Sequence, residues 1–335
     1  MTPDPTMRSP SDQPPNDRTA DRLSRRDFLG RLALGAAAAP AAATALAGCA
    51  SSPRVATATT STTSTTVAPA ATGAVAGAGA SATRVPGLQL YTVRSLMEKD
   101  VEGTLRAVAE IGYKELEFAG YYNRPPAALK ATLDSLGMRA PAAHIPLDQL
   151  RASMPAVLDA AAALGHQYIV CPFLMPADRA PDAYKRLAAE FNGFGRAVRA
   201  RGMRFAYHNH DFEFADVGAG RTGYDVLLAE TDPQLVQFEL DLYWATHAGR
   251  DPVTIFGAHP GRFALCHVKD LRDPQGAKGM APVGEGTIDF ARIFAAGQQA
   301  GLRHFFVEHD SAAEYPGGPL ASVRTSYAAL SRLLA

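Results

Sequence analysis

From Leu88 to the C-terminus, short apolar runs alternate with longer segments in which apolar residues recur every three or four positions. The short runs are typical of buried strands and the longer segments of amphipathic helices. The pattern predicts eight strands, over Leu88–Val93, Glu115–Ala119, Arg139–His144, Gln167–Cys171, Arg204–Asn209, Val236–Asp241, Arg262–Val268 and His304–His309. It predicts helices over Val101–Ile111, Pro125–Leu136, Leu147–Leu164, Ala180–Arg201, Gly223–Glu230, Ile288–Ala300 and Leu320–Leu334, and a poorly defined one around Pro252–Ala258.

Eight strand–helix units in about 250 residues have the size of a closed (β/α)8 barrel. Glycines follow many of the predicted helices, as helix C-termini prefer; they are Gly112, Gly137, Gly165, Gly202 and Gly301. No glycine-rich phosphate loop follows the first strand. We therefore predict one α/β domain over residues 85–335, a (β/α)8 TIM barrel, with an open doubly wound sheet as the alternative.

The first 49 residues have the composition of an export signal. Two consecutive arginines within Ser24–Leu29 precede Gly30–Gly48, an Ala- and Leu-rich run without acidic residues, which predicts a twin-arginine (Tat) signal. The run is too short for a good membrane-spanning helix. Leu46–Cys49 resembles a lipoprotein cleavage site, so Cys49 either becomes a lipid-carrying N-terminus, the one membrane contact we expect, or follows an ordinary cleavable signal. Either way we expect a periplasmic or cell-envelope protein.

Residues 50–84 consist mostly of Ala, Thr, Ser and Gly, and such a segment cannot bury enough apolar surface to offset its ordering entropy, so we predict a disordered linker. Without residues 1–84, the chain has three more acidic than basic residues. This balance argues against a nucleic-acid partner, because phosphate binding needs a basic surface. Cys171 and Cys266 lie in apolar runs, and we expect both to be buried and free.

Ionisable residues follow the apolar part of four consecutive predicted strands. Side chains alternate between the barrel interior and the helix layer, so only residues of one parity can meet inside. In the sixth strand this places Glu239 and Asp241 inside, with Asp241 uppermost. His208, Asp241, His267 and Glu308 then supply two imidazoles and two carboxylates from four strand ends. Nitrogen and oxygen donors that converge in this way predict a site for one divalent metal ion.

The whole of the predicted barrel resembles the sugar phosphate isomerase/epimerase group of xylose isomerase-like TIM barrels, a barrel type shared with family 2 AP endonucleases. Many short motifs occur in the order typical of this group, which makes the resemblance specific for the superfamily but not for a substrate. The matching segments are Gly87–Arg94, Tyr207–Phe214, Leu240–Trp244, His267–Asp270, Val283–Phe290 and Val307–Glu308.

The resemblance implies a Mn, Zn, Co or Mg ion that holds vicinal oxygens of a sugar, with an acid, Asp, His and Glu as ligands on strands five to eight. Asp241, His267 and Glu308 match the last three positions. His208 departs from the pattern, because the better-known ketose epimerases have Glu there and use two opposed glutamates as bases. The resemblance makes Glu308 the candidate catalytic base, and Lys269 is placed to stabilise a developing oxyanion.

Other polar residues near the same rim are weaker candidates. His210 and Glu117 are reserve acid/base groups. For the remaining residues, as for Glu117, contact with substrate and a structural role are both open; they are Gln89, His144, Trp244 and Glu285.

The leading interpretation is a metal-dependent isomerase/epimerase that removes a proton next to the carbonyl of an unphosphorylated keto sugar or cyclitol. The same enediolate can lose a β-substituent, so a lyase is the close alternative, by 3-keto-glycoside elimination or inosose dehydration. A non-catalytic, lipid-anchored sugar-binding protein is a further alternative. A metal-dependent endonuclease is disfavoured by the acidic balance and the predicted export. We expect a small-molecule sugar as the partner.

Overall fold

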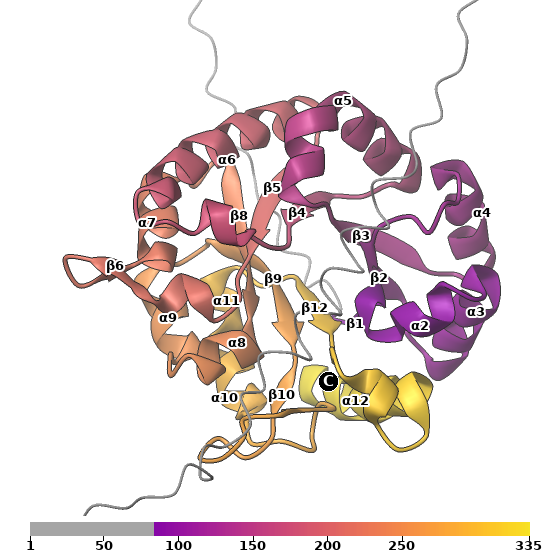
Figure 1. Cartoon of the computed structure of the whole chain (residues 1–335). Coiled ribbons are helices and arrows are strands. Elements are labelled where there is room, and N and C mark those ends of the chain that lie inside the picture. Colours follow the sequence, from indigo (N-terminus) through magenta and orange to yellow (C-terminus); the bar gives the residue numbers. More distant parts are fainter. Residues whose placement is uncertain (1–83) are drawn as a thin grey trace, which may run out of the picture. The chain divides into compact units, whose positions relative to one another are not determined.

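The computed structural model describes residues 84–335, and they form a closed barrel of eight parallel strands surrounded by helices (Figure 1). Around the barrel the strand order is β1-β12-β9-β8-β5-β4-β3-β2. The predicted (β/α)8 barrel is confirmed, and the open sheet is excluded. The predictions of a Tat signal over residues 1–49 and of a linker fall outside the described residues, apart from residue 84. The barrel strands are β1 (Pro86–Gln89), β2 (Glu115–Ala119), β3 (Arg139–His144), β4 (Tyr168–Cys171), β5 (Arg204–His208), β8 (Val236–Asp241), β9 (Phe263–Val268) and β12 (His304–Val307).

The outer layer consists of helices of very different lengths. They are α2 (Arg94–Met97), α3 (Val101–Ile111), α4 (Pro126–Ser135), α5 (Leu147–Leu164), α6 (Ala183–Ala200), α7 (Gly223–Glu230), α8 (Leu242–His247), α9 (Pro252–Ala258), α10 (Phe290–Ala295), α11 (Gly297–Ala300) and α12 (Gly318–Leu334). Two small hairpins project from the loops, β6 (Asp216–Gly218) with β7 (Arg221–Thr222) and β10 (Asp270–Leu271) with β11 (Met280–Ala281).

The first predicted strand, Leu88–Val93, is wrong beyond Gln89. Residues Leu90–Val93 form the 3-10 helix η1 instead. The side-chain oxygen of Gln89 accepts a hydrogen bond from the backbone nitrogen of Tyr91 at 3.0 Å, and this bond favours a tight turn over an extended chain. The polar residue at this position therefore ends the strand.

Several helices differ from the expected ones, and the short helix α2 was not predicted. Helix α5 is interrupted at Ser153 (φ −144°, ψ 34°), two residues before Pro155. The interruption arises because proline has no backbone N–H to donate and its ring clashes with the carbonyl of the residue four positions earlier. The predicted helix Ile288–Ala300 is two short helices, α10 and α11. Helix α8 was not predicted; it starts directly after β8, and the Asp241 side chain caps it by accepting a hydrogen bond from the Trp244 backbone nitrogen at 2.8 Å.

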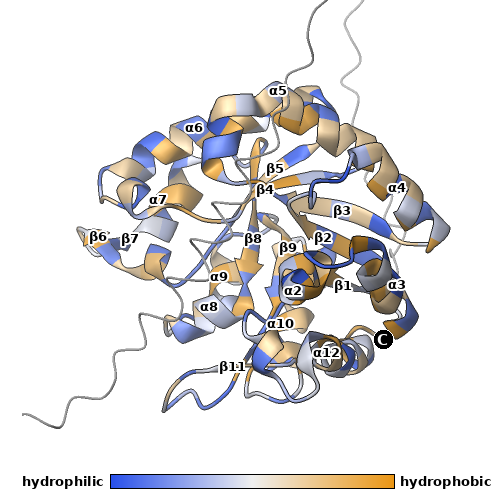
Figure 2. Cartoon of the chain, turned by 45° about the vertical axis from the view of Figure 1, so that its right-hand side comes forward, coloured by the Kyte–Doolittle hydropathy of each residue, from blue (hydrophilic) through white to orange (hydrophobic). Residues whose placement is uncertain are grey.

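The strands bury both of their faces. Val236, Phe238 and Leu240 point to the helix layer and belong to the main core, as the parity of the sixth strand predicts. Figure 2 shows that hydrophobic colours predominate along the barrel strands. On the inner faces a second apolar cluster fills the barrel; it consists of Ala142, Tyr168, Val170, Ala206, Ala264, Leu265 and Phe306. Ala206, Leu265 and Phe306 each lie two residues before a polar residue at the strand end, so this apolar layer forms the floor beneath the polar centre.

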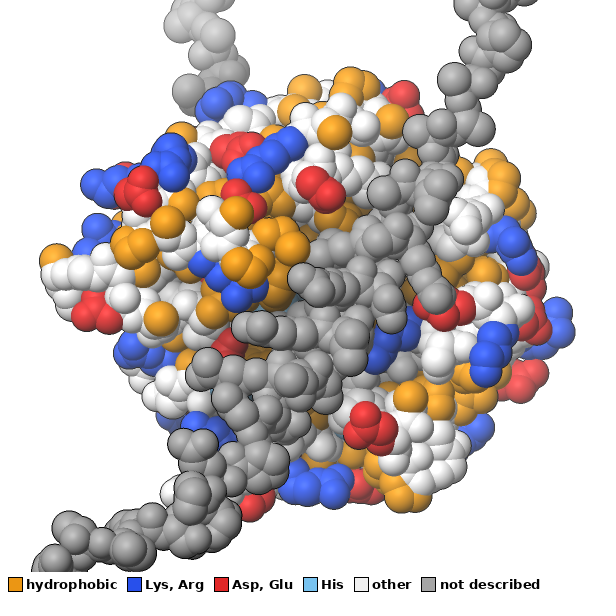
Figure 3. Space-filling view, viewed as in Figure 1, with side chains coloured by type: hydrophobic (Ala, Val, Ile, Leu, Met, Phe, Trp, Pro, Cys, Tyr) orange, Lys and Arg blue, Asp and Glu red, His pale blue; other side chains and the backbone are white. Residues whose placement is uncertain are grey.

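Two further observations concern the cysteines and the surface. Cys171 and Cys266 are both buried and free, as predicted. Basic and acidic side chains are interspersed over the part of the surface that Figure 3 shows in colour. Within residues 84–335, no helix combines the length and apolar composition that crossing a bilayer requires.

Candidate metal centre

The register of the strands brings the polar strand ends together at one end of the barrel. Strand β5 pairs with β8 so that His208 lies opposite Glu239. Strand β8 pairs with β9 so that Asp241 lies opposite His267. All four side chains are buried, so the centre lies in a region of low dielectric constant where charge–charge interactions are strong.

Glu239 is the hub of the lower part of this centre. Its Oε2 atom lies 2.9 Å from His144 Nε2, 3.0 Å from His208 Nδ1 and 3.2 Å from His267 Nε2. Glu117 reinforces the group from β2, with its Oε2 atom 2.6 Å from His267 Nε2. Three imidazoles and two carboxylates from five strands thus converge on a few ångströms of space.

The upper part of the centre contains the strand-end carboxylates. His267 Nδ1 lies 2.9 Å from Glu308 Oε2 and 3.9 Å from Asp241 Oδ2, and His208 Nε2 lies 3.8 Å from Asp241 Oδ2. The structure therefore brings together all four residues that the sequence nominated as metal ligands. The ammonium of Lys269 is inserted among them, 2.7 Å from Glu308 Oε2 and 3.0 Å from Asp241 Oδ2.

Burial determines the protonation of most groups in this centre. It raises the pKa of Glu117 and Glu239 well above the ordinary value, and neighbouring carboxylates contribute in the same direction. Burial also raises the pKa of Asp241, to about 7, although the nearby ammonium opposes the shift. The same burial lowers the pKa of His208 and His267 well below the ordinary value. The imidazoles of His208 and His267 are thus neutral and have lone pairs available for a cation.

Lys269 is charged despite its burial. Desolvation alone would lower its pKa, but the carboxylates of Asp241, Asp310 and Glu308 reverse this effect and hold the pKa well above the ordinary value. The centre therefore contains one fixed positive charge among several carboxylates.

The residues fit a bound divalent cation. Glu117 Oε1 and Glu239 Oε1 are buried oxygens that have no hydrogen-bond partner among the described residues, and a buried, unpaired carboxylate oxygen is costly. Two groups of donor atoms are close enough to hold an ion; one consists of His144, His208, Glu239 and His267, and the other of Asp241, His267 and Glu308. Neutral imidazoles and carboxylates are the usual ligands of Zn and suit other divalent transition metals.

His210 lies above the predicted ligands and is half-buried. Its ring stacks on Phe212 with centroids 5.8 Å apart, and it lies 5.4 Å from the ring of Trp244. Trp244 lies 5.7 Å from the Lys269 ammonium. His210 thus lies beside His208, with ring centroids 5.1 Å apart, and Trp244 lies beside Lys269. The sequence analysis named these two residues as an acid/base group and a possible substrate contact.

Glu213 holds the backbone that carries His210. It lies in the 3-10 helix η3 (Phe212–Phe214), accepts a hydrogen bond from the backbone nitrogen of His210 at 2.8 Å, and accepts another from the hydroxyl of Tyr207. Burial raises the pKa of this carboxyl to about 7, while these hydrogen bonds oppose the shift. One buried acid therefore fixes the turn that follows β5.

Two of the weaker candidates have different surroundings. Gln89 is buried and donates to Glu117 Oε2 at 2.8 Å, so it orients a carboxylate of the centre. Glu285 is exposed, and it accepts a hydrogen bond from the Tyr315 hydroxyl at 2.7 Å. The structure does not bring Glu285 into the buried cluster.

The loop that carries Glu285 is attached to the barrel through Asp270. This buried carboxylate accepts hydrogen bonds from the backbone nitrogens of Gly284 at 2.9 Å, Gly286 at 3.0 Å and Ile288 at 3.1 Å. A Cβ atom at Gly286 would lie 2.3 Å from Asp270 Oδ1. The approach of the loop to this carboxylate therefore requires glycine there.

The sequence analysis did not nominate Glu239, although it placed this residue inside the barrel. The available signal was its parity, since Glu239 lies two residues before Asp241 on the same face of the strand. For His144 the sequence analysis left substrate contact and a structural role open, and the structure places it among the potential ligands. Glu239 lies two residues before the end of β8, below the strand ends where the prediction looked for ligands, whereas His144 is itself the last residue of β3.

Comparisons with known proteins find similar sequences and similar solved structures. An inosose dehydratase from Lacticaseibacillus casei is 28% identical over 245 residues, which cover 61% of this chain and 81% of that protein. Two crystal structures from Parabacteroides distasonis ATCC 8503, both described as a sugar phosphate isomerase/epimerase, are also similar. One is 26% identical with a TM-score of 0.65 and covers 74% of this chain and 98% of its own. The other is 28% identical with a TM-score of 0.63 and covers 78% and 97%.

The sequence profile of one protein family, described as xylose isomerase-like TIM barrel, matches residues 105–328. This match spans about two thirds of the chain and most of the barrel. The resemblance found in the sequence motifs is confirmed, and the chain belongs to the xylose isomerase-like TIM barrel family.

Proposed function

We propose that this protein is a divalent-metal-dependent lyase that removes water from an unphosphorylated polyhydroxylated ketone, such as an inosose. The observation that carries the proposal is the residue at the end of β5. A two-base epimerase needs a carboxylate there, opposite Glu308, but the position is occupied by His208, whose Nδ1 atom is bonded to Glu239. An elimination needs one base and a separate acid, which the remaining groups can supply.

The ion would be held by His208, Asp241, His267 and Glu308, with Glu239 as a further ligand beside the two imidazoles. When bound, it acts as a Lewis acid and increases the acidity of the C–H bond next to the substrate carbonyl. His208, Asp241, His267 and Glu308 each lie within one residue of the end of a different barrel strand. Because the strands are rigid, the donor set is preorganised.

Glu308 removes the proton next to the carbonyl, and Lys269 stabilises the negative charge that develops on the carbonyl oxygen. The electron pair of the C–H bond then forms a C=C bond as the C–O bond to the neighbouring hydroxyl breaks. His210 donates a proton to the departing hydroxyl, which leaves as water. The substrate loses one molecule of water, and no oxidant or reductant is required.

Two lines of evidence support this choice of reaction and substrate. The inosose dehydratase from Lacticaseibacillus casei dehydrates an inosose according to its name, and its similarity spans most of its length. The predicted export through the Tat pathway favours an unphosphorylated substrate in the cell envelope, because sugar phosphates are cytoplasmic intermediates.

An isomerase or epimerase is the second candidate. It is favoured by the two Parabacteroides structures, which are described as sugar phosphate isomerase/epimerases. It shares proton removal by Glu308 with the lyase and differs in the last step, where a proton returns to carbon and water is not lost.

Incubation of the metal-loaded protein with inososes and keto sugars in D₂O separates these candidates. The lyase yields a product lighter by one water, whereas the isomerase or epimerase yields a product of unchanged formula that carries solvent deuterium. Glu308→Gln should abolish both signals, and Glu314→Gln, an exposed acid outside the centre, should preserve them. A protein that holds metal but produces neither signal with any of these substrates would contradict the proposal.

A further inference from the structure

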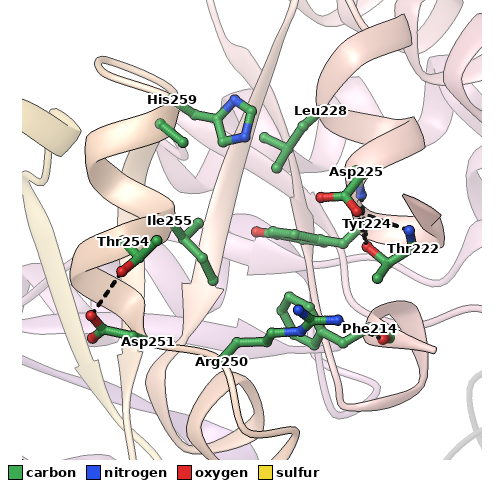
Figure 4. Close-up of a pocket in the computed structure, with 11 residues that line it drawn as sticks. Phe214, Thr222, Tyr224, Asp225, Leu228, Arg250, Asp251, Thr254, Ile255 and His259 are labelled. Carbon is green, nitrogen blue, oxygen red and sulfur yellow. Dashed lines mark hydrogen bonds between the residues drawn. The ribbon is translucent and has the colours of Figure 1, made fainter. Parts of the chain in front are cut away.

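A cavity lies in the outer layer of the barrel, between α7 and α9 (Figure 4). Its volume is about 200 Å³. Phe214 of η3, Leu228 of α7 and Ile255 of α9 form much of its apolar wall. None of the residues that line it belongs to the candidate metal centre, so the cavity is a separate feature of the fold.

The hydroxyl of Tyr224 is the central polar group of this cavity. The side chain is 1% exposed, and its oxygen has no hydrogen-bond partner among the described residues. Figure 4 shows the hydroxyl directed across the cavity toward Ile255. Burial raises the pKa of Tyr224 well above the ordinary value, so the group remains protonated and can donate. A buried donor without a partner is costly, and a ligand with an acceptor would remove this cost.

The charge around the cavity is unbalanced. Asp225 caps the start of α7, and Asp251 forms an ion pair with Arg292 at 2.8 Å, so both acids of the lining already have partners. Arg250 forms no ion pair within the part of the chain that the structure describes, and its guanidinium makes one long contact, 3.4 Å to the carbonyl of Phe214. The cation at the rim is therefore available to an anion.

A second guanidinium lies behind the wall of the cavity. Arg262 is buried and donates to the carbonyl of Leu228 at 2.9 Å and to Thr231 Oγ1 at 2.8 Å, while its Nε atom has no partner among residues 84–335. Burial and this guanidinium lower the pKa of His259, so the imidazole at the edge of the cavity is neutral. The two acids of the lining, Asp225 and Asp251, stand against three guanidiniums, those of Arg250, Arg262 and the Arg292 that pairs with Asp251. These charges sum to +1, which favours an anionic group.

We propose that this cavity binds a small carboxylic acid whose apolar body is about the size of one ring. The carboxylate accepts a hydrogen bond from the Tyr224 hydroxyl and pairs with Arg250, while the ring packs against Phe214, Leu228 and Ile255. A dry cavity of about 150 Å³ holds a benzene molecule, so this volume suits a ring with one small substituent.

The test uses the full-length, metal-loaded protein and 4-fluorobenzoate as the probe, followed by ¹⁹F NMR. We expect saturable binding with a dissociation constant of about 1 mM or below. Tyr224→Phe should weaken binding about tenfold or more, because it removes a hydrogen bond to a charged group. Arg250→Gln should weaken binding to a similar extent, and because Arg250 is exposed, the change should leave folding intact.

Tyr121→Phe is the matched control, because the Tyr121 hydroxyl is also buried and without a partner in the described residues but lies outside the cavity. It should leave probe binding unchanged. Without the probe, Tyr224→Phe should unfold at the same temperature as the parent protein or higher, since no hydrogen bond is lost. The proposal is overturned if 4-fluorobenzoate does not saturate the protein, if both variants bind it as well as the parent, or if 4-fluorobenzylamine binds more tightly.

Discussion

The variant Glu239→Gln tests whether Glu239 is a metal ligand or only a structural hydrogen-bond acceptor. The change keeps the size of the side chain and removes its charge. In the metal-free protein the Glu239 carboxylate is buried near Glu308 and Asp241, and both raise its pKa after burial itself. Its neutralisation should therefore leave the free energy of unfolding of the metal-free protein unchanged or higher. In the metal-loaded protein, the loss of a donor oxygen should weaken binding of the ion.

The expected size of this effect follows from linkage. An ion present at 100 times its dissociation constant stabilises the folded state by about 2.7 kcal/mol. If the variant binds the ion about 100-fold more weakly, the same concentration equals the new dissociation constant and the gain is about 0.4 kcal/mol. The metal-dependent increment should thus fall by about 2 kcal/mol, which corresponds to roughly 5–9 °C in the midpoint of thermal unfolding for a domain of this size.

Thermal unfolding with and without chelator measures both quantities, and Glu115→Gln is the matched control. Glu115 is another buried barrel carboxylate, but it is bonded to His304 Nδ1 at 2.8 Å and to Arg139 at 2.6 Å. Although burial raises the pKa of Glu115, these partners reverse the shift and lower it below the ordinary value. Glu115→Gln should therefore destabilise the metal-free protein by about 1–3 kcal/mol and leave the metal increment intact.

Two results would refute the reasoning on Glu239. If Glu239→Gln retains the full metal increment, Glu239 does not contribute to metal binding. If it destabilises the metal-free protein as much as Glu115→Gln does, then Glu239 serves the three imidazoles as a structural acceptor.

Three further predictions concern catalysis, pH dependence and packing. Glu308→Gln should lower turnover by about 10²–10⁴-fold in the D₂O assay, with substrate affinity retained by calorimetry; a loss of affinity alone would argue against a catalytic base. The pKa of Glu213 is raised from 4.5 to about 7 in the folded state, so the stability that this group contributes is lost as the pH rises through this range. The free energy of unfolding should therefore fall by about 3 kcal/mol between pH 4.5 and 7. Urea unfolding of Glu213→Gln should show a smaller fall over the same range. Gly195→Ala should lower the free energy of unfolding in urea by about 1–3 kcal/mol, because its Cβ would lie 2.5 Å from the carbonyl oxygen of Leu235. Gly193→Ala on the same helix should raise it by about 0.5–1 kcal/mol, because the nearest atom to its Cβ would be 3.9 Å away. Equal effects of the two changes would contradict the packing argument.

The sequence was sufficient for the barrel because parity and apolar periodicity are local properties. Strand β8 reads from Val236 to Asp241 in both the prediction and the structure, since its helix-facing residues are uniformly apolar. The end of β1 was not predictable in this way. There the chain turns because the Gln89 side chain bonds the Tyr91 backbone, and such a bond leaves no periodic signal.

The pattern of apolar and polar residues also could not predict how deep in the barrel the candidate site extends. The ends of strands can be predicted from a sequence, but the register in which two strands pair cannot. A register shift between Phe238 and Glu239 in the pairing of β8 with β9 places Glu239 opposite Leu265, two residues before His267. Glu239 reaches His144 on β3 only because the barrel closes, and closure is a long-range property.

The attachment of the loop to Asp270 has a consequence for how this protein can vary. One carboxylate gathers backbone nitrogens from positions 284, 286 and 288, while β10 and β11 pair the chain just after Asp270 with Met280 and Ala281. The intervening stretch, residues 272–279, is therefore fastened at its base. Its entropy of closure grows slowly with length, so insertions or deletions there should change the rim above the barrel and leave the ligands below in register. This stretch is the place in the fold where new substrate preferences can be grafted at low cost in stability.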